Sequence, residues 1–95
     1  MDIESVRHKQ LRAFLETGVP KAIDARLVGR LRNMIAFLNA AHNVEELKVP
    51  PNFGFHFLEG EREGTASITL TKNWQMTFKV NAANEIIELD LEDYH

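Results

Sequence analysis

The sequence predicts an α+β fold, in which two N-terminal helices pack on a small antiparallel sheet. In the first half of the chain, apolar residues recur at steps of three and four, as on one face of a helix. From residue 53 onward they alternate with polar residues and are interrupted by short turns, as in neighbouring antiparallel strands. We expect a single domain over residues 1–95, because a chain of 95 residues allows one modest core.

Two amphipathic helices are expected. The first runs over residues 7–17 and ends at Gly18, a residue favoured at helix ends. The second follows the break at Pro20 and carries a stripe of six apolar residues: Ile23, Leu27, Leu31, Met34, Ile35 and Leu38. Three arginines lie off this stripe: Arg26, Arg30 and Arg32. They form either a solvated helix face or a contact surface for an anionic partner. A short helical turn is expected over residues 40–48.

The strands are expected at residues 53–58, 66–70, 74–80 and 85–91, with a short first strand at 3–6. In the segment 53–58 the three phenylalanines share one face, so His56 lies on the other. Trp74 and Phe78 share the phase of Met76 and Val80, which predicts that they belong to the core.

The last strand is expected to hold the end of the chain in place. Ile87, Leu89 and Leu91 alternate with three acidic residues, Glu88, Asp90 and Glu92. This is the pattern of a half-buried strand, and we expect it to be paired and largely inner. The three terminal side chains, Asp93, Tyr94 and His95, would then sit at a fixed place on the sheet rather than in a free tail.

Composition excludes several classes of protein. Without cysteine there is no disulfide framework and no thiolate chemistry. No stretch reaches membrane-spanning length and the start lacks the pattern of a secretory signal, so a cytoplasmic protein without membrane contacts is expected. The net charge is −3, with +2 over residues 1–48 and −5 over residues 49–95. This is not the basic balance that is typical of a nucleic-acid binder.

The candidate chemistry lies in the sheet half. The four histidines have no metal-ligand spacing and no phosphate-binding glycine loop is present, so neither a metal nor a cofactor is expected. His56 and His95 remain, with Asp93 and Tyr94 beside the second. RNA cleavage needs one group that takes the proton of a 2′-hydroxyl and another that protonates the leaving 5′-oxygen. Two imidazoles suit these roles, because the ordinary pKa of histidine is about 6.5. A carboxylate such as Asp93 could orient one ring. Taken alone, two exposed histidines in a chain of this length are more often ordinary polar surface than a catalytic pair.

The chain resembles the HigB family, the plasmid-maintenance killer toxins of the RelE/ParE superfamily. The resemblance rests on these segments: His56-Phe57-Leu58-Glu59-Gly60-Glu61-Arg62-Glu63-Gly64, Ser67-Ile68, Asn73-Trp74-Gln75-Met76-Thr77-Phe78 and Glu92-Asp93-Tyr94-His95. It covers residues 53–95, and the two N-terminal helices have the right length and order.

The resemblance implies a toxin that cleaves messenger RNA on the translating ribosome without a metal, and a cognate helix-turn-helix antitoxin. The family's catalytic histidine falls on His56, and its C-terminal catalytic residues fall on Asp93, Tyr94 and His95. We expect Arg62 and Lys72 to bind RNA.

The sequence also departs from the family's pattern. Glu59 stands where the family has lysine, Gln75 stands where it has arginine, and Thr65-Ala66 replaces an aromatic pair. Cations stabilise the charge of a scissile phosphate in the transition state, so these departures predict a weakened anion clamp beside intact proton-transfer groups. An alternative to the active toxin is therefore a homologue that mainly binds its antitoxin. A gyrase-poisoning relative, which the superfamily fold also implies, ranks last because that branch does not need the two histidines.

Overall fold

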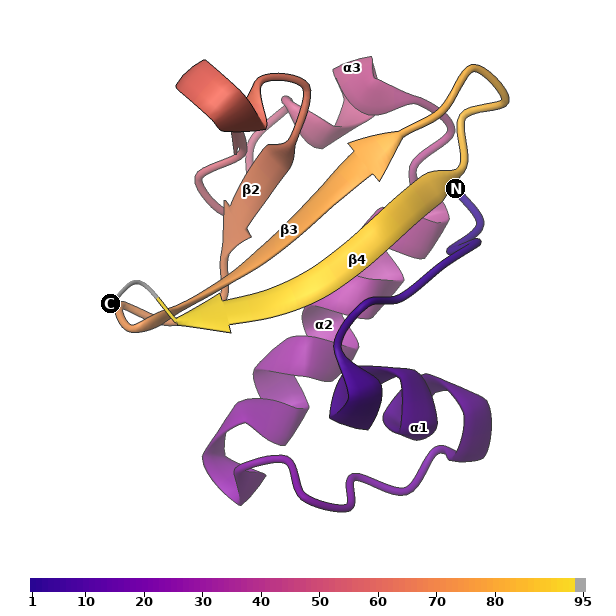
Figure 1. The fold of residues 1–95 in the computed structure, drawn as a ribbon, viewed down its shortest axis with the longest axis vertical. Helices are drawn as coiled ribbons and strands as arrows, with labels where there is room; N and C mark the ends of the chain where they lie inside the picture. Colours follow the sequence, from indigo (N-terminus) through magenta and orange to yellow (C-terminus); the bar gives the residue numbers. More distant parts are fainter. Residues whose placement is uncertain (94–95) are drawn as a thin grey trace.

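A computed structural model describes residues 1–93. Three helices come first: α1 (Lys9–Thr17), α2 (Ala25–Ala40) and the single-turn α3 (Val44–Leu47). Four strands follow: β1 (His56–Phe57), β2 (Ala66–Thr69), β3 (Trp74–Val80) and β4 (Ile86–Asp93). A short 3-10 helix, η1 (Gly60–Arg62), lies between β1 and β2. Helix α2 crosses one face of the sheet and α1 packs beside it, which confirms the predicted α+β fold (Figure 1).

Both long helices form where the apolar stripes predict them. Helix α1 ends at Gly18, whose φ of 75° is the left-handed conformation that glycine adopts at low cost, and its N–H donates to the carbonyl of Phe14. Helix α2 begins after Asp24, whose carboxylate accepts a hydrogen bond of 2.9 Å from the backbone N–H of Arg26. The buried residues of α2 are Leu27, Leu31, Met34 and Leu38.

One hydrophobic cluster lies between the helices and the sheet. Its members with no exposed surface come from both layers: Leu11, Leu31, Leu38, Leu47, Ile68, Met76, Phe78, Ile86 and Leu89. Trp74 and Val80 are half-buried and pack against it, as predicted. Within the described part of the chain, no helix is long and apolar enough to cross a bilayer.

The sheet has the order β1-β2-β3-β4 with every neighbour antiparallel, which confirms the predicted meander. The first strand is shorter than predicted, because it begins only at His56. Phe53 and Gly54 have φ angles of 52° and 70°, so the backbone turns there and the alternation of phenylalanines does not mark a continuous strand. Phe57 is 46% exposed, whereas Phe55 is half-buried.

A bulge in β4 changes which of its side chains point toward the core, so the predicted inward residues are partly wrong. Thr77 pairs with Asp90 but Lys79 pairs with Ile87, so β4 holds one extra residue, and Glu88 there has a φ of 54°. An extra residue puts the side chains before it out of phase with those after it. Ile86 is therefore fully buried, while Ile87, which the simple alternation places inward, is half-buried.

Residues 3–6 do not form the predicted strand. They lie along the outer edge of β4 as two isolated parallel bridges, from Ile3 to Ile86 and from Val6 to Leu89. The N–H of Leu89 donates to the carbonyl of Ser5 at 3.0 Å. Strand β4 is an edge strand of the sheet and not the inner strand that was predicted, although the N-terminal segment pairs with much of its outer edge.

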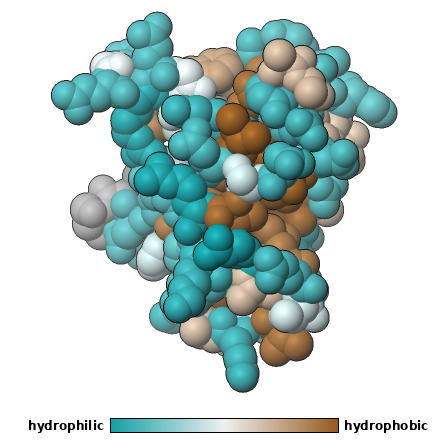
Figure 2. Space-filling model, turned by 45° about the vertical axis from the view of Figure 1, so that its right-hand side comes forward, coloured by the Kyte–Doolittle hydropathy of each residue, from teal (hydrophilic) through white to brown (hydrophobic). Residues whose placement is uncertain are grey.

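A groove of about 580 Å³ lies between this N-terminal segment and the two long helices. Its apolar lining comes from Ile3, Val6, Leu15 and Ile35. On the face that Figure 2 shows, hydrophobic surface gathers in the middle and hydrophilic side chains surround it. The groove shares no residue with the face of the sheet that carries His56.

Candidate functional site

The face of the sheet away from the helices carries most of the candidate chemistry, and we call it the polar face. Its side chains follow from the register: His56 pairs with Ser67, Ser67 with Thr77, and Thr77 with Asp90. A second row contains Thr69, Gln75 and Glu92. Directly paired residues share a face of a sheet, so the two rows lie side by side.

His56 lies in the short strand β1 and is exposed. Its Nδ1 lies 2.9 Å from the carbonyl oxygen of Gly54. A carbonyl oxygen only accepts hydrogen bonds, so Nδ1 carries the proton and Nε2 of the neutral ring is left as an acceptor. The left-handed turn at Gly54 thus fixes the tautomer. The ring can accept a proton at Nε2 in one step and donate it in another.

An ion pair crosses the polar face from the turn after β1 to the end of β4. Nη1 of Arg62 lies 2.9 Å from Oε1 of Glu92, and Nη2 lies 2.5 Å from Oε2. The hydroxyl of Thr77, which is 2% exposed, also donates to Oε2. The hydrogen bond from Arg62 is the main cause that lowers the pKa of Glu92, and the hydrogen bond from Thr77 adds to it. The same pair raises the pKa of Arg62.

The two positions that depart from the family's pattern lie near this ion pair. Gln75 is directly opposite Glu92, and its Oε1 accepts a hydrogen bond of 2.6 Å from the hydroxyl of the buried Ser67. Glu59 is exposed at the N-cap of η1, where its side chain makes no capping hydrogen bond. It lies beside a shallow hollow that the residues 57–64 form. Glu59 therefore places a free carboxylate beside the turn that carries Arg62.

A smaller hollow of about 190 Å³ lies on the polar face near the ion pair. Three cations line it: Arg7, Arg62 and Lys79. Lys79 lies 3.5 Å from a carboxylate oxygen of Glu88, so two of the three cations are paired with acids. This pairing reduces the positive potential that the hollow presents to an anion.

Asp93, the described member of the C-terminal candidates, lies in β4 at the opposite edge of the sheet from His56 in β1. Asp93 is exposed and pairs with Trp74, so it lies on the face of Trp74 and not on the polar face. Three strand spacings, about 14 Å, separate β1 from β4, so the structure does not bring Asp93 into contact with His56. Tyr94 and His95 lie outside the described residues.

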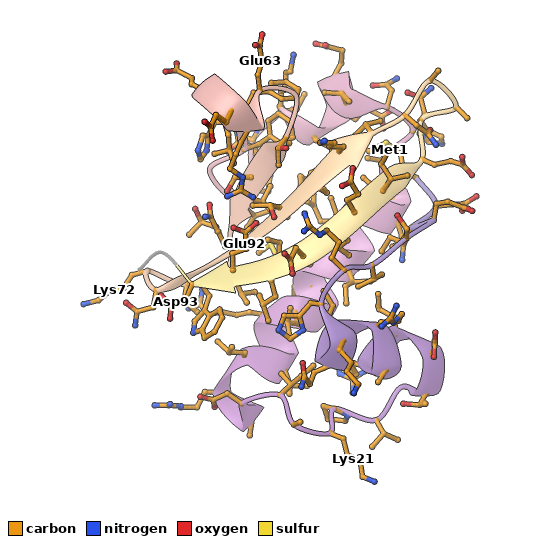
Figure 3. The ribbon with its side chains drawn as sticks, in the orientation of Figure 1. Met1, Lys21, Glu63, Lys72, Glu92 and Asp93 are labelled. Atoms are coloured by element: carbon orange, nitrogen blue, oxygen red, sulfur yellow. The ribbon has the colours of Figure 1, made fainter. Side chains whose placement is uncertain are left out.

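Lys72 is exposed in the turn between β2 and β3, at the same end of the sheet as Asp93 (Figure 3). Arg62 and Lys72, both expected to bind RNA, therefore lie at different places, one over the polar face and the other at its end. Among residues 1–93, no three His, Asp or Glu side chains are grouped so that they could hold a metal ion.

Glu92, Thr77 and Ser67 were not predicted as site residues. Alternation places Glu92 outward, but nothing in the sequence shows that its partner is 30 residues away. That pairing requires the register of β2, β3 and β4 and the fold of η1.

Comparison with known proteins now identifies the family. Residues 4–95 match the family described as the RelE-like toxin HigB of type II toxin–antitoxin systems. This chain belongs to the HigB-like toxin family. The Endoribonuclease HigB of Proteus vulgaris is 36% identical over 93 residues, which cover 98% of this chain and 99% of that protein.

Solved structures show the same fold in more distant relatives. YafQ from E. coli strain BL21(DE3) matches with a TM-score of 0.62 at 14% identity, covering 98% of this chain and 92% of that one. The YoeB/ParE toxin from Agrobacterium tumefaciens matches with a TM-score of 0.58 at 15% identity, over the full length of both chains. The HigB-like chain thus has a RelE/ParE-type fold, as its sequence predicts.

Proposed function

We propose that this HigB-like toxin is an endoribonuclease that cleaves messenger RNA on the translating ribosome without a metal. The observation that carries the proposal is the full-length relationship, at 36% identity, to a protein named Endoribonuclease HigB. The exposed His56, whose Nε2 is left as an acceptor, supports it.

In the proposed reaction, a base takes the proton of a ribose 2′-hydroxyl, and its oxygen attacks the adjacent phosphorus. The bond from phosphorus to the 5′-oxygen breaks as an acid protonates that oxygen, which leaves a cyclic phosphate and a 5′-hydroxyl. His56 supplies one of these proton transfers through Nε2. We propose that Asp93, Tyr94 and His95 supply the other and orient it, and that Arg62 and Lys72 bind the RNA backbone.

We further propose that the activity is weakened. Gln75 is neutral and bonded to Ser67, and Glu59 adds an exposed negative charge. A transition state with developing negative charge gains less stabilisation from such a set than from unpaired cations. The same observation favours the second candidate, a homologue that mainly binds its antitoxin.

The proposed partners follow from the family. A toxin of a type II system acts with an antitoxin, and we propose that this one carries a helix-turn-helix domain. The ribosome and messenger RNA are the proposed targets, which places the action in the cytoplasm. A short neighbouring gene for a helix-turn-helix protein would be the antitoxin.

The test is inducible expression without the antitoxin, with growth and the 5′ ends of cellular messenger RNA measured together. The proposal predicts new 5′ ends within coding regions and slowed growth, both lost in His56→Ala. His42→Ala is the matched control, because His42 is also exposed but lies beside α3, where it contacts Glu46. Unchanged messenger RNA together with tight antitoxin binding would favour the second candidate.

A further inference from the structure

The guanidinium of Arg62 is only partly used by its ion pair. Nη1 and Nη2 each donate one hydrogen bond to Glu92, whereas a guanidinium has five N–H donors in a planar fork. Nε makes no hydrogen bond to any residue in the range 1–93. The Arg62 side chain is 46% exposed. The edge formed by Nε and its neighbouring Nη is therefore available to a second oxyanion.

Glu92 is itself held in place. Both of its oxygens accept from Arg62, and one also accepts from the hydroxyl of Thr77, a residue with almost no exposed surface. Displacing the carboxylate would leave the buried Thr77 hydroxyl without its acceptor and would separate a bidentate ion pair, which is costly. An incoming anion would therefore join this arrangement more easily than it would replace Glu92.

We infer that Glu92 is a positioning residue, which holds Arg62 so that the free edge of its guanidinium binds a backbone phosphate of the RNA. This inference rests on the proposed function, because it requires an RNA strand on the polar face. The pair spans β2 and β3, and His56 lies on the same face. One strand of RNA crossing the sheet meets both groups. The planar fork suits a phosphate at two points, so its orientation matters as well as its charge.

The inference makes a prediction whose sign differs from that of simple electrostatics. Replacing Glu92 by glutamine removes a negative charge from a surface that binds RNA. If Glu92 acted only through its charge, binding would tighten. If Glu92 positions Arg62, binding weakens by about tenfold, the lower end of the cost of losing an orienting partner at a metal site.

The assay measures the affinity of each variant for ribosomes programmed with a messenger RNA whose 2′-hydroxyls are methylated and cannot be cleaved. Glu92→Gln is expected to bind about tenfold more weakly than the parent. The matched control is Glu63→Gln, which removes the same charge from an exposed side chain of the same turn (Figure 3). It is expected to bind as tightly as the parent or more tightly. Equal or tighter binding by Glu92→Gln would overturn the inference.

A double-mutant cycle separates positioning from a general structural effect. In the Arg62→Ala background, Glu92→Gln is expected to cause no further loss, because the residue that it positions is gone. A tenfold loss that persists in this background would overturn the inference. Thr77→Val keeps the side-chain shape and removes only the third hydrogen bond to Glu92, so it is expected to weaken binding by a smaller factor. It supplies the test if Glu92→Gln does not fold.

Cleavage of an unmodified messenger RNA is measured separately on the same ribosomes. If the parent protein binds but does not cleave, the proposed nuclease activity is wrong. The affinities of the variants would then still decide whether Glu92 positions Arg62. A parent that does not bind programmed ribosomes would overturn both. Binding and cleavage by the parent, with Glu92→Gln weaker in both, would support both.

Discussion

Combining Glu59→Lys with Gln75→Arg changes three units of charge around the turn that carries Arg62. A unit charge about 8 Å from a phosphate interacts by roughly 2 kcal/mol at an effective dielectric constant near 20. Glu59 is exposed, so salt and solvent reduce this to about 1 kcal/mol per unit. Glu59→Lys changes two units and is therefore expected to stabilise the transition state by about 2 kcal/mol.

Gln75→Arg is expected to stabilise the transition state less, because a neighbouring carboxylate reduces the effect of the new charge. Position 75 is directly opposite Glu92, at a Cβ separation of about 5 Å, so the new arginine would be largely neutralised. We assign Gln75→Arg about 0.5 kcal/mol, half the value of an exposed unit charge, because Glu92 offsets part of its field. It also removes the acceptor of the buried Ser67 hydroxyl, which should lower the free energy of unfolding by about 1 kcal/mol or more.

Together the two changes give about 2.5 kcal/mol, which corresponds to a rate increase of about seventyfold. The assay is single-turnover cleavage of messenger RNA on purified ribosomes, at a temperature where both proteins are folded. Glu16→Lys is the control, since it makes the same change of two charge units on α1. Adding His56→Ala to the double variant should abolish the gain, because a cation cannot replace a proton carrier.

A rate increase below about threefold in a folded double variant would refute the reasoning that missing cations limit the activity. An equal increase in Glu16→Lys would also refute it, because the effect would then come from the net charge of the protein and not from the polar face.

Three other predictions concern the proton-transfer groups, the ion pair of Glu92 and the pairing of the N-terminal segment. His56→Ala and deletion of His95 should each lower cleavage at least about tenfold with little change in melting temperature, as expected for proton-transfer groups; full activity in both variants would exclude them. The pKa of Glu92 lies below its ordinary value of 4.5 in the folded state, so its contribution to stability is present above that pH and is lost as the pH falls through the lowered pKa. Urea unfolding of Glu92→Gln should therefore show a flatter loss of stability below about pH 5 than the parent does, and parallel acid limbs would contradict the ion pair. In hydrogen exchange, the amide of Leu89, which donates to Ser5, should be strongly protected, and rapid exchange there would contradict the pairing of the N-terminal segment.

The elements that could be predicted from the sequence are those whose pattern is local. The stripe of α2 and the alternation in β3 each repeat over several turns or residues, so the buried side chains follow from their spacing. Where the backbone adopts left-handed angles, the spacing of apolar residues no longer predicts which side chains are buried. Glu88 adds a residue to β4 and exchanges Ile87 for Ile86 in the core, and Phe53 delays the start of β1.

The candidate site divides in the same way. His56 could be placed on the outward face because its neighbours fix the phase, but the tautomer depends on the carbonyl of Gly54, which a turn brings back to the ring. The partnership of Arg62 with Glu92 could not be predicted, because it joins two segments across two intervening strands. Contacts of this kind depend on register, which no single segment of the sequence contains.

The division of the sheet into two faces explains how such a fold can persist while its activity changes. Met76 and Phe78 lie on the helix side and are fully buried, so replacing either would cost several kcal/mol, on the order of 2–5. Position 59 is exposed and outside the core, so an acid there in place of the family's lysine costs the fold little. The likeness to YafQ at 14% identity shows that the fold tolerates extensive substitution. Strength of catalysis can therefore vary on the polar face while the core keeps the sheet, and with it the position of His56, unchanged.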